Sequence, residues 1–385
     1  MKRSYIAKRF QSSGAGLSLD TEALAKYKDI IDLSIGDTDF TTDESIINAA
    51  FRDAKAGHTH YGDPKGDPEL IDAVCRAWEE DFGQRLPRDH VLVSASSCLG
   101  MALVMLAILD PGDEVIILEP AYISYLQLAR AAHARAVPVH AKEENGWLPD
   151  LDELRAAVTP KTKLLVLNTP GNPTGVVYPR EVLQQIAALA QEQDFLVLSD
   201  EVYEKLIYGG AQHVSIASLD GMKERTITIN GFSKAFAMTG WRMGYLAADA
   251  RLILPMLKVH QYAVASSNII AQSAAITALQ AGESCVEEMR REYARRRQFL
   301  LDAFAPIPEI SCVAPAGTFY IYPNISGTGL SGTEFADKFL MEAGVATVPG
   351  TAFDSFCNSH IRLSYASSME SLQTAVSRLK GMLKK

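Results

Sequence analysis

The stretch GFSKAFAMTGWRMGY, residues 231–245, contains Lys234 and, eight positions further on, Arg242. Small and apolar residues follow the lysine, from Ala235 to Met238, whereas a solvated surface lysine usually has polar neighbours. One interpretation is a lysine that extends its charge to water from a partly buried segment. The other is an amine whose pKa is lowered by apolar surroundings, so that it can attack a carbonyl carbon.

Short apolar runs predict the strands that would position this lysine and its neighbours. Runs with little alternation, typical of strands buried on both faces, occur at 91–94, 114–118, 163–168, 195–199, 225–230 and 244–248. Amphipathic segments lie between them, and Asp67 with Pro68, and Pro179, mark two helix starts. The alternation predicts an α/β fold with a mostly parallel central sheet. In such sheets ligands bind where strands end and helices begin.

Asp200 and Tyr203 follow one of these strands, in the sequence SDEVY. In isolation, such an aspartate is more often an acidic turn residue that faces water or caps the next segment. A carboxylate in a low-dielectric site would instead keep a pyridine nitrogen protonated through a charge-assisted hydrogen bond. The Tyr203 hydroxyl could then donate to a neighbouring phenolate oxygen.

Two further strand ends carry polar groups. The loop NTPGNPTG, at 168–175, is stiffened by prolines and turned by glycines, so it either connects two elements or points the Asn172 amide into a site. The segment SASSCLGMALVML, at 94–106, offers free helix N–H groups to a phosphate, with Arg242 as countercharge, although an ordinary serine cap explains it equally well. No GxGxxG follows a strand, so dinucleotide binding has little support.

Composition limits the partners and the location. The chain has 385 residues, 48% of them hydrophobic and 22% charged, with a net charge of −9, which argues against nucleic acid and anionic membrane surfaces as partners. Five scattered cysteines without a CxxC pair indicate reduced thiols rather than disulfides or a zinc site, and no metal is expected. The basic N-terminus has no apolar region after it and no run of 18 apolar residues occurs, so we expect a cytoplasmic protein.

The pattern of predicted helices and strands changes after about residue 285. A charged helix at 286–304, short strands near 310–313, 319–323 and 360–365, and a closing helix from 368 indicate a smaller α+β domain. The first 45 residues show no strand run of their own and are expected to pack against it. We therefore predict a large domain at 46–284 and a small domain formed by 1–45 and 285–385.

Taken together, the sequence resembles the fold-type I pyridoxal phosphate (PLP) enzymes, specifically the class I/II aminotransferases close to bacterial aspartate aminotransferases. The resemblance spans nearly the whole chain. The segments that carry it are LSIGDTDF, YGDPKGDPELIDAV, LDPGDEVIILEPAYISY, NTPGNPTGVVY, SDEVYEKLIY, SKAFAMTGWRMGY, VPGTAF and HIRLSYA.

The resemblance implies a role for each matching residue and a homodimer. Lys234 would bind PLP as a Schiff base and then serve as general base. The remaining implied roles are pairing with the pyridine nitrogen (Asp200), contact with the ring hydroxyl oxygen (Tyr203 and Asn172), stacking on the ring (Tyr122), binding of the phosphate (Ser96, Ser97, Cys98 and Arg242, with Tyr61 from the neighbouring subunit) and binding of the substrate carboxylate (Gly36, Asn172 and Arg362).

Three positions depart from the residues common in this family. Ser97 stands where glycine is frequent, Gly231 where serine is frequent, and Thr38 where proline is frequent. None of these removes chemistry, because backbone N–H groups remain in the phosphate loop. Gly231 cannot offer the phosphate a hydroxyl, so we expect Arg242 to carry more of the binding. Cys98 is interpreted as a small residue at a helix start rather than as a nucleophile.

The expected activity is transfer of an amino group from an L-amino acid to a 2-oxo acid, with 2-oxoglutarate the expected acceptor, by a ping-pong mechanism. A β- or γ-eliminating lyase, such as a C–S lyase, is the alternative, because elimination begins from the same carbanion. A non-enzymatic PLP-binding regulator is a third hypothesis, against which the lack of a DNA-binding extension speaks. The helix segment LGMALVML has no cation for a distal carboxylate, so aromatic and aliphatic donors stay open beside acidic ones.

Overall fold

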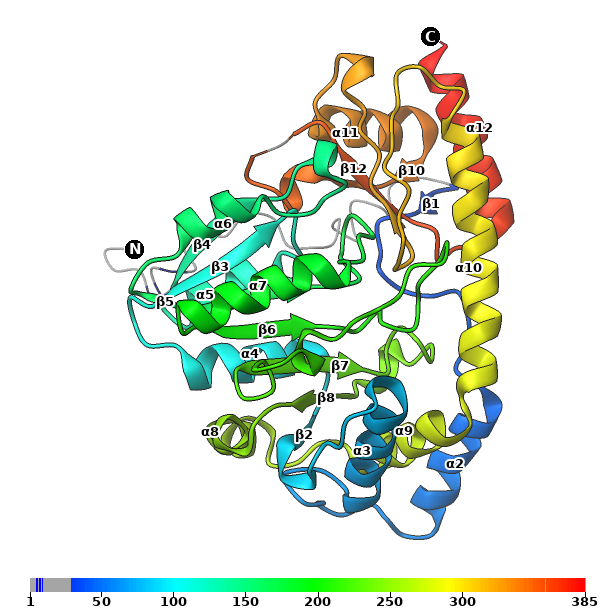
Figure 1. Ribbon diagram of the computed structural model, residues 1–385. Helices are drawn as coiled ribbons and strands as arrows, with labels where there is room; N and C mark the ends of the chain where they lie inside the picture. The colour runs from blue at the N-terminus through cyan, green and yellow to red at the C-terminus, as the bar shows by residue number, and fades with distance from the viewer. Residues whose placement is uncertain (1–4, 6, 8, 10–28, 357, 385) are drawn as a thin grey trace.

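The computed structural model describes residues 5, 7, 9, 29–356 and 358–384, and a seven-stranded sheet forms its centre (Figure 1). The strand order is β2-β8-β7-β6-β5-β3-β4. β8 runs antiparallel to its neighbours β2 and β7, and the other neighbouring strands pair in parallel, which confirms the predicted α/β class. The strands are β2 (Val91–Ser94), β3 (Glu114–Glu119), β4 (Arg135–His140), β5 (Thr162–Asn168), β6 (Leu196–Asp200), β7 (Thr226–Gly231) and β8 (Gly244–Ala247).

β4 is the strand of this sheet that the sequence did not predict. It lies at the edge, pairs only with β3 and is partly exposed over most of its length. Pro138 interrupts its pattern, yet proline is tolerated on an edge strand because the missing N–H faces away from the ladder. The apolar signal of the inner strands is therefore absent here. The other predicted strands of the sheet correspond closely to β2, β3 and β5 to β8.

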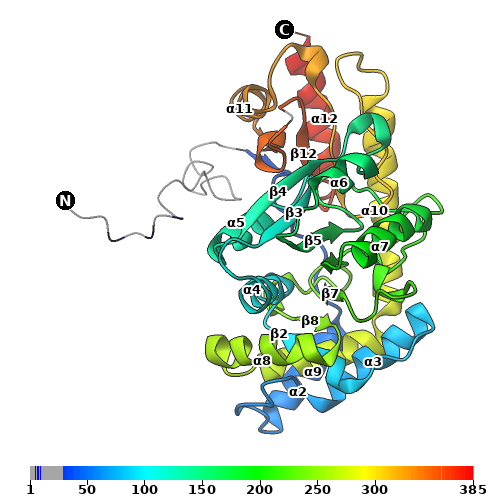
Figure 2. The ribbon, with the colours of Figure 1, turned by 60° about the vertical axis from the view of Figure 1, so that its left-hand side comes forward.

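Helices cover both faces of the sheet because successive strand residues point in opposite directions (Figure 2). Ile117 packs in one apolar cluster with α4, α5 and α8, whereas Ile116 packs in another with α6 and α7. Asp67 caps α3, as predicted, and its side chain accepts the Glu69 N–H at 2.8 Å. The helices are α2 (Glu44–Lys55), α3 (Pro68–Phe82), α4 (Ser97–Ile108), α5 (Ser124–Ala131), α6 (Leu151–Ala157), α7 (Arg180–Glu192), α8 (Ala250–Val264) and α9 (Ile269–Ala281).

A second group of elements surrounds a three-stranded sheet of order β11-β12-β9. The long helix α10 runs along one side of the molecule, from α9 to α12 (Figure 1). These elements are α10 (Glu283–Phe304), α11 (Gly332–Ala343), α12 (Met369–Leu383), β9 (Tyr320–Ile321), β11 (Val348–Pro349) and β12 (Ile361–Ser364). The closing helix is confirmed. The domain boundaries, 46–284 against 1–45 and 285–385, stay a prediction.

Two expectations for this second group are corrected by the structure. β1 (Ile31–Asp32) pairs in parallel with β10 (Val345–Ala346), although no strand was predicted within the first 45 residues. A two-residue strand is too short to leave an apolar pattern. At 310–313 there is no strand, only a single bridge between Ser311 and Asn324. Among the described residues, no helix is long and apolar enough to cross a membrane.

The expectation of reduced thiols can be compared with the structure for four of the five cysteines. Cys75, Cys98, Cys285 and Cys312 are free, and Cys98 is the exposed one of the four. Cys357 lies outside the described residues.

A buried ion pair lies at the carboxyl end of β6. Glu201 follows Asp200, so the two carboxylates point to opposite faces of the strand end. Glu201 is fully buried and accepts the hydroxyls of Ser199 and Ser215 at 2.7 and 2.8 Å and bonds to His213 Nε2 at 2.9 Å. Burial lowers the pKa of His213, but the Glu201 carboxylate outweighs it and the pKa is raised.

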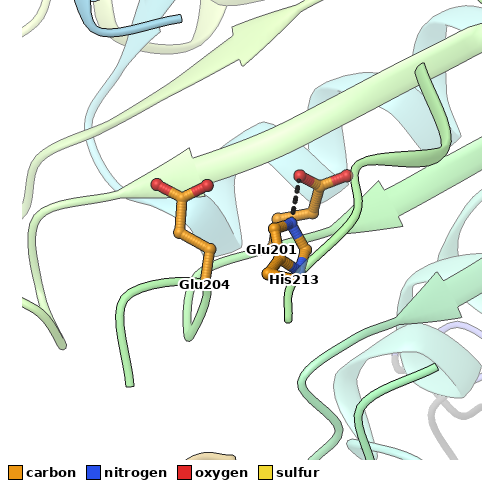
Figure 3. Close-up of side chains that lie close together, drawn as sticks. All are labelled: Glu201, Glu204 and His213. Carbon is orange, nitrogen blue, oxygen red and sulfur yellow. Dashed lines mark hydrogen bonds and ion pairs between the residues drawn. The ribbon is translucent and has the colours of Figure 1, made fainter. Parts of the chain in front are cut away.

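Glu204 completes this group from the next turn of the chain (Figure 3). The ligand-type atoms of Glu201, Glu204 and His213 lie within 4.8 Å of one another. Both oxygens of Glu201 already accept hydrogen bonds from protein donors. We therefore assign this side chain a structural role.

Replacing Glu201 with alanine is expected to lower the free energy of unfolding by about 3 kcal/mol, because it leaves the buried His213 and two serine hydroxyls without their acceptor. Urea denaturation followed by circular dichroism measures the difference. Glu80→Ala, on the exposed face of α3, is the matched control and should change it by less than about 0.5 kcal/mol. Equal losses in the two variants would contradict the role given to the ion pair.

Candidate active site

A cavity of about 410 Å³ lies at the carboxyl ends of the central strands. Its wall combines loops that follow β2, β5, β6 and β7 with residues of the second group of elements. Eleven of the twelve residues predicted for the site line it: Gly36, Ser96, Ser97, Cys98, Tyr122, Asn172, Asp200, Tyr203, Lys234, Arg242 and Arg362. Tyr61 is the exception, with 90% of its side chain exposed and no place in this wall.

Lys234 enters the cavity from the loop after β7. The four residues after it, Ala235 to Met238, are buried, so the chain holds the lysine at the edge of an apolar cluster. Its Nζ donates to the carbonyl oxygen of Gly36 at 2.6 Å. The same atom lies 5.9 Å from the ring centre of Tyr203 and 5.5 Å from that of Phe319. The amine therefore faces the cavity, among aromatic rings, rather than bulk water.

Asp200, at the end of β6, is the buried carboxylate of the site and is only 3% exposed. Burial raises its pKa to about 6, although hydrogen bonds from the Tyr125 hydroxyl and the Val202 N–H oppose the rise. Tyr125 donates to Oδ2 at 2.6 Å and the Val202 N–H to Oδ1 at 3.3 Å. The carboxylate is thus held in place while its charge is only partly compensated.

Tyr125 is a site residue that the sequence did not reveal. It lies in α5, is fully buried and stands edge-on to Tyr122, with ring centres 5.7 Å apart. Burial raises the pKa of Tyr125, and the nearby Asp200 raises it further, so the hydroxyl keeps its proton and can donate. The segment EPAYISY contains both tyrosines, but its spacing does not show that the second one reaches Asp200.

Arg362 enters the cavity from β12 and is 4% exposed. Its Nη1 donates to Asn172 Oδ1 at 3.0 Å, and its Nη2 donates to the Ser34 carbonyl at 2.6 Å. Within the described part of the chain its hydrogen-bond acceptors are the neutral Asn172 side chain and the Ser34 carbonyl, and its Nε has no hydrogen-bond partner. A buried guanidinium with only neutral partners favours a carboxylate ligand, which its fork can bind through two parallel bonds.

The loop after β5 holds Asn172 in position. Asn168, the last residue of β5, accepts the Asn172 backbone N–H at 2.8 Å and donates to the Asp200 carbonyl at 2.9 Å. Asn168 also lines the cavity, although we had predicted no role for it. The rigid loop therefore presents the Asn172 side chain to Arg362 and ties two neighbouring strand ends together.

The first turn of α4 also lines the cavity. Ser96 caps the helix, because its Oγ accepts the Leu99 N–H at 3.1 Å, so the expected capping role is real. The N–H groups of Ser97 and Cys98 lie in that first turn, where helix geometry gives them no intrahelical acceptor. Arg242 also lines this cavity and donates to the Thr239 carbonyl at 2.8 Å.

Gly231 and Gly244 allow this turn to pack closely against the sheet. A Cβ atom on Gly231 would lie 2.5 Å from Ser97 Oγ, and one on Gly244 would lie 2.7 Å from the Ser97 backbone nitrogen. The backbones of β7 and β8 therefore approach the start of α4 without intervening side chains. Cys98 stands beside the ring of Tyr122, with its Sγ 3.9 Å from the hydroxyl oxygen.

The residues in this cavity fit an aromatic aldehyde that carries a ring nitrogen and a phosphate. A lysine amine is available for the aldehyde, a buried carboxylate for a protonated nitrogen, and a helix N-terminus with an arginine for the phosphate. The glycines below α4 let its first turn pack directly on the sheet, at the carboxyl ends of the strands. This is the donor set that PLP requires.

Comparison with known proteins gives the same answer. The family model "Aminotransferase class I and II" matches residues 28–379. An aspartate aminotransferase of Pyrococcus horikoshii is 39% identical over 94% of this chain and 93% of its own, and aromatic-amino-acid aminotransferase 2 of Thermococcus litoralis is 41% identical over 92% of each. The solved structure of the aspartate aminotransferase from Thermus thermophilus with maleate has a TM-score of 0.93 and 38% identity, covering 99% of this chain and all of that one.

These matches cover nearly the whole chain, and they agree with the chemistry of the cavity. The chain belongs to the class I and II aminotransferase family and is a PLP-dependent enzyme that transfers an amino group between amino acids and 2-oxo acids.

Proposed function

We propose that this enzyme transfers the amino group of an L-amino acid to 2-oxoglutarate by a ping-pong mechanism, with PLP held by the residues that line the 410 Å³ cavity. The observation that carries the proposal is that Lys234, Asp200 and Arg362 meet in this one cavity although they come from three separate segments. Bound PLP supplies an electron sink for the carbanion formed at the substrate Cα.

Asp200 and its neighbours are proposed to hold the cofactor ring. Asp200 would accept the N–H of the protonated ring nitrogen, while Tyr203 and Asn172 would donate to the ring hydroxyl oxygen. Burial raises the pKa of Tyr203 well above its ordinary value, which keeps its hydroxyl protonated for this purpose. Tyr122 would stack on the ring.

The start of α4 is proposed to bind the phosphate. The N–H groups of this turn and the positive end of the helix dipole both favour a dianion, and Arg242 adds a full positive charge. The residues involved are Ser96, Ser97, Cys98 and Arg242.

Arg362 and Lys234 are proposed to act on the substrate. Arg362, with Asn172 and the backbone of Gly36, binds the α-carboxylate and so fixes the direction of the Cα–H bond. The Lys234 amine, once released from the cofactor, would remove the proton from Cα and deliver it to the carbon that was the aldehyde carbon of the cofactor. Its present bond to the Gly36 carbonyl, 2.6 Å long, places it beside this carboxylate site.

The amino donor is left to experiment because the cavity wall offers few charges. Its cations within the described residues are Lys234, Arg242 and Arg362, and each has a proposed task. None remains for a distal carboxylate, and the aspartate and aromatic names of the relatives span both donor classes. The donor panel below therefore includes acidic, aromatic and aliphatic amino acids.

The purified enzyme is expected to convert at least one donor of this panel to its 2-oxo acid only when 2-oxoglutarate is present, with glutamate as coproduct. Lys234→Ala should lower turnover about 1000-fold or more, because it removes both the covalent anchor and the base. Coupled detection of glutamate measures this, and Lys258→Ala, an exposed lysine of α8, is the control. Full turnover by Lys234→Ala would disprove the proposal, and release of ammonia with a 2-oxo acid in the absence of an acceptor would establish the eliminating lyase instead.

The affinity of the apo-protein for PLP is expected to fall as the pH drops below about 6. Burial raises the pKa of Asp200 to about 6, and the protonated acid cannot accept the charged ring N–H, so the interaction is present above this pH and lost below it. Asp200→Asn should bind PLP about tenfold less tightly at pH 8 and lack this step. Fluorescence titrations over a pH series measure both proteins. The cofactor phosphate also titrates in this pH range, but it does so equally in the wild type and in Asp200→Asn. If the PLP affinities of the two proteins showed the same dependence on pH, the role of Asp200 would be contradicted.

We also propose a homodimer in which Tyr61 of the partner subunit reaches the phosphate. Tyr61 is 90% exposed and lies outside the cavity wall of its own chain, so it can serve a site only across an interface. Sedimentation is expected to give twice the chain mass of 41.9 kDa. Tyr61→Phe should weaken PLP binding about threefold to tenfold, whereas Tyr262→Phe, at a side chain 92% exposed, should not. A fully active monomer would refute this assembly.

A further inference from the structure

We propose that Tyr320 is a positioning residue that orients both Arg362 and Tyr203. The proposal rests on the proposed function, since it gives these two residues their tasks. Tyr320 lies in β9, is 2% exposed and lines the same cavity, and we had predicted no role for it.

The ring of Tyr320 supports the guanidinium of Arg362. β9 and β12 are antiparallel, with Tyr320 opposite Ser364, so Arg362, two residues before Ser364, lies on the same face of the sheet as a diagonal neighbour. Arg362 Cζ is 4.3 Å from the ring centre of Tyr320 and 4.8 Å from that of Phe353. Two rings therefore contact the guanidinium, while its Nη atoms are held by Asn172 and Ser34.

This contact fixes the plane of the guanidinium. Bonds from two Nη atoms alone allow the group to tilt, whereas a flat ring against it restricts the tilt. The direction in which a carboxylate can bind is set by that plane, because both parallel bonds of the fork must lie in it. The aromatic ring also stabilises a buried cation whose hydrogen-bond partners among the described residues are both neutral.

The hydroxyl of Tyr320 has a second, separate contact. The Tyr203 hydroxyl donates to it at 3.1 Å, and both tyrosines are buried. A phenol has one proton, so when Tyr203 donates to the ring hydroxyl oxygen, the Tyr320 hydroxyl would donate to Tyr203 in its place. The hydroxyl also lies directly against Gly36, at a place that a Cβ atom on this residue would occupy. Because Gly36 has no side chain, the Tyr320 hydroxyl can contact its Cα side, while the Gly36 carbonyl accepts a hydrogen bond from Lys234. Tyr320 consequently contacts residues proposed for the carboxylate, Arg362 and Gly36, and the residue proposed for the ring oxygen, Tyr203.

Two substitutions separate the ring from the hydroxyl. Tyr320→Phe keeps the ring, and Tyr320→Met keeps an apolar side chain of similar length without an aromatic face. Tyr365→Phe is the matched control, because Tyr365 is also fully buried and donates to the Thr318 carbonyl at 3.0 Å but lies outside the cavity wall. PLP content and circular dichroism are recorded for each holoenzyme.

Tyr320→Met is expected to raise the KM for both the amino acid and the 2-oxo acid about tenfold, with a smaller change in kcat, because a tilted Arg362 binds carboxylates less well. The dissociation constants of maleate and 3-phenylpropionate, two carboxylates that do not react, should rise by a similar factor. Tyr320→Phe should leave these constants within about twofold of the wild type, since it retains the ring.

Tyr320→Phe is instead expected to raise the pH midpoint of the absorbance change of the bound cofactor by about 0.5 unit, because a less fixed Tyr203 stabilises the ring oxygen anion less. Tyr365→Phe should alter neither carboxylate affinity nor this midpoint. An unchanged carboxylate affinity in Tyr320→Met together with an unchanged midpoint in Tyr320→Phe would overturn the proposal, and so would equal effects in Tyr365→Phe.

Failure of the positioning role differs in outcome from failure of the proposed function. If Tyr320→Met does not fold, the absorbance midpoint of Tyr320→Phe still decides whether the hydroxyl positions Tyr203. If the wild type shows no acceptor-dependent turnover, the proposed function fails, while the affinities for maleate and 3-phenylpropionate still decide the role of the ring.

Discussion

The burial of a carboxylate at the end of β6 is the constraint on which the rest of the site depends. Asp200 and Glu201 are adjacent and both buried, yet they are compensated differently. Glu201 receives two hydroxyls and a histidine, which leaves it no free oxygen. Asp200 receives one phenol and one backbone N–H, so burial still raises its pKa to about 6. The carboxylate with the incomplete partner set is the one that faces the cavity, where a cationic ring nitrogen would complete the set.

The second group of elements supplies the opposite charge. Arg362 is buried with only neutral hydrogen-bond partners among the described residues, and Tyr320 and Phe353 contact its guanidinium. The bond from Arg362 to Asn172 crosses from β12 to the loop after β5. The cavity thus contains a buried anion on one side and a buried cation on the other, each anchored to a different sheet. The carboxylate of an amino acid would suit the arginine, and the protonated ring nitrogen of PLP would suit the aspartate.

The strand ends could be predicted from the sequence because the central strands are buried on both faces and leave continuous apolar runs. Their order places Asp200 and Lys234 together without any knowledge of side-chain contacts. The edge strand β4 was missed since Pro138 and partial exposure remove this signal. Tyr125 and Tyr320 were missed for another reason: each reaches its partner, Asp200 or Arg362, across a long stretch of chain. Helix packing and the register of β9 on β12 decide those contacts. Neither can be predicted from the spacing of residues within a short segment.

The two departures at Ser97 and Gly231 show how such distant contacts change an interpretation. In the sequence they stand far apart, and Gly231 alone indicated the loss of a hydroxyl near the phosphate site. In the structure, Ser97 Oγ lies where the side chain of residue 231 would begin, 2.5 Å from the position of its Cβ, and donates to the Asn230 carbonyl at 3.4 Å. A hydroxyl is therefore still present at this point, but the start of α4 provides it instead of the end of β7. Because the two side chains would compete for the same space, the glycine is a condition for the serine. The Ser97 hydroxyl donates to the Asn230 carbonyl, so the expectation that Arg242 carries more of the phosphate binding is unchanged.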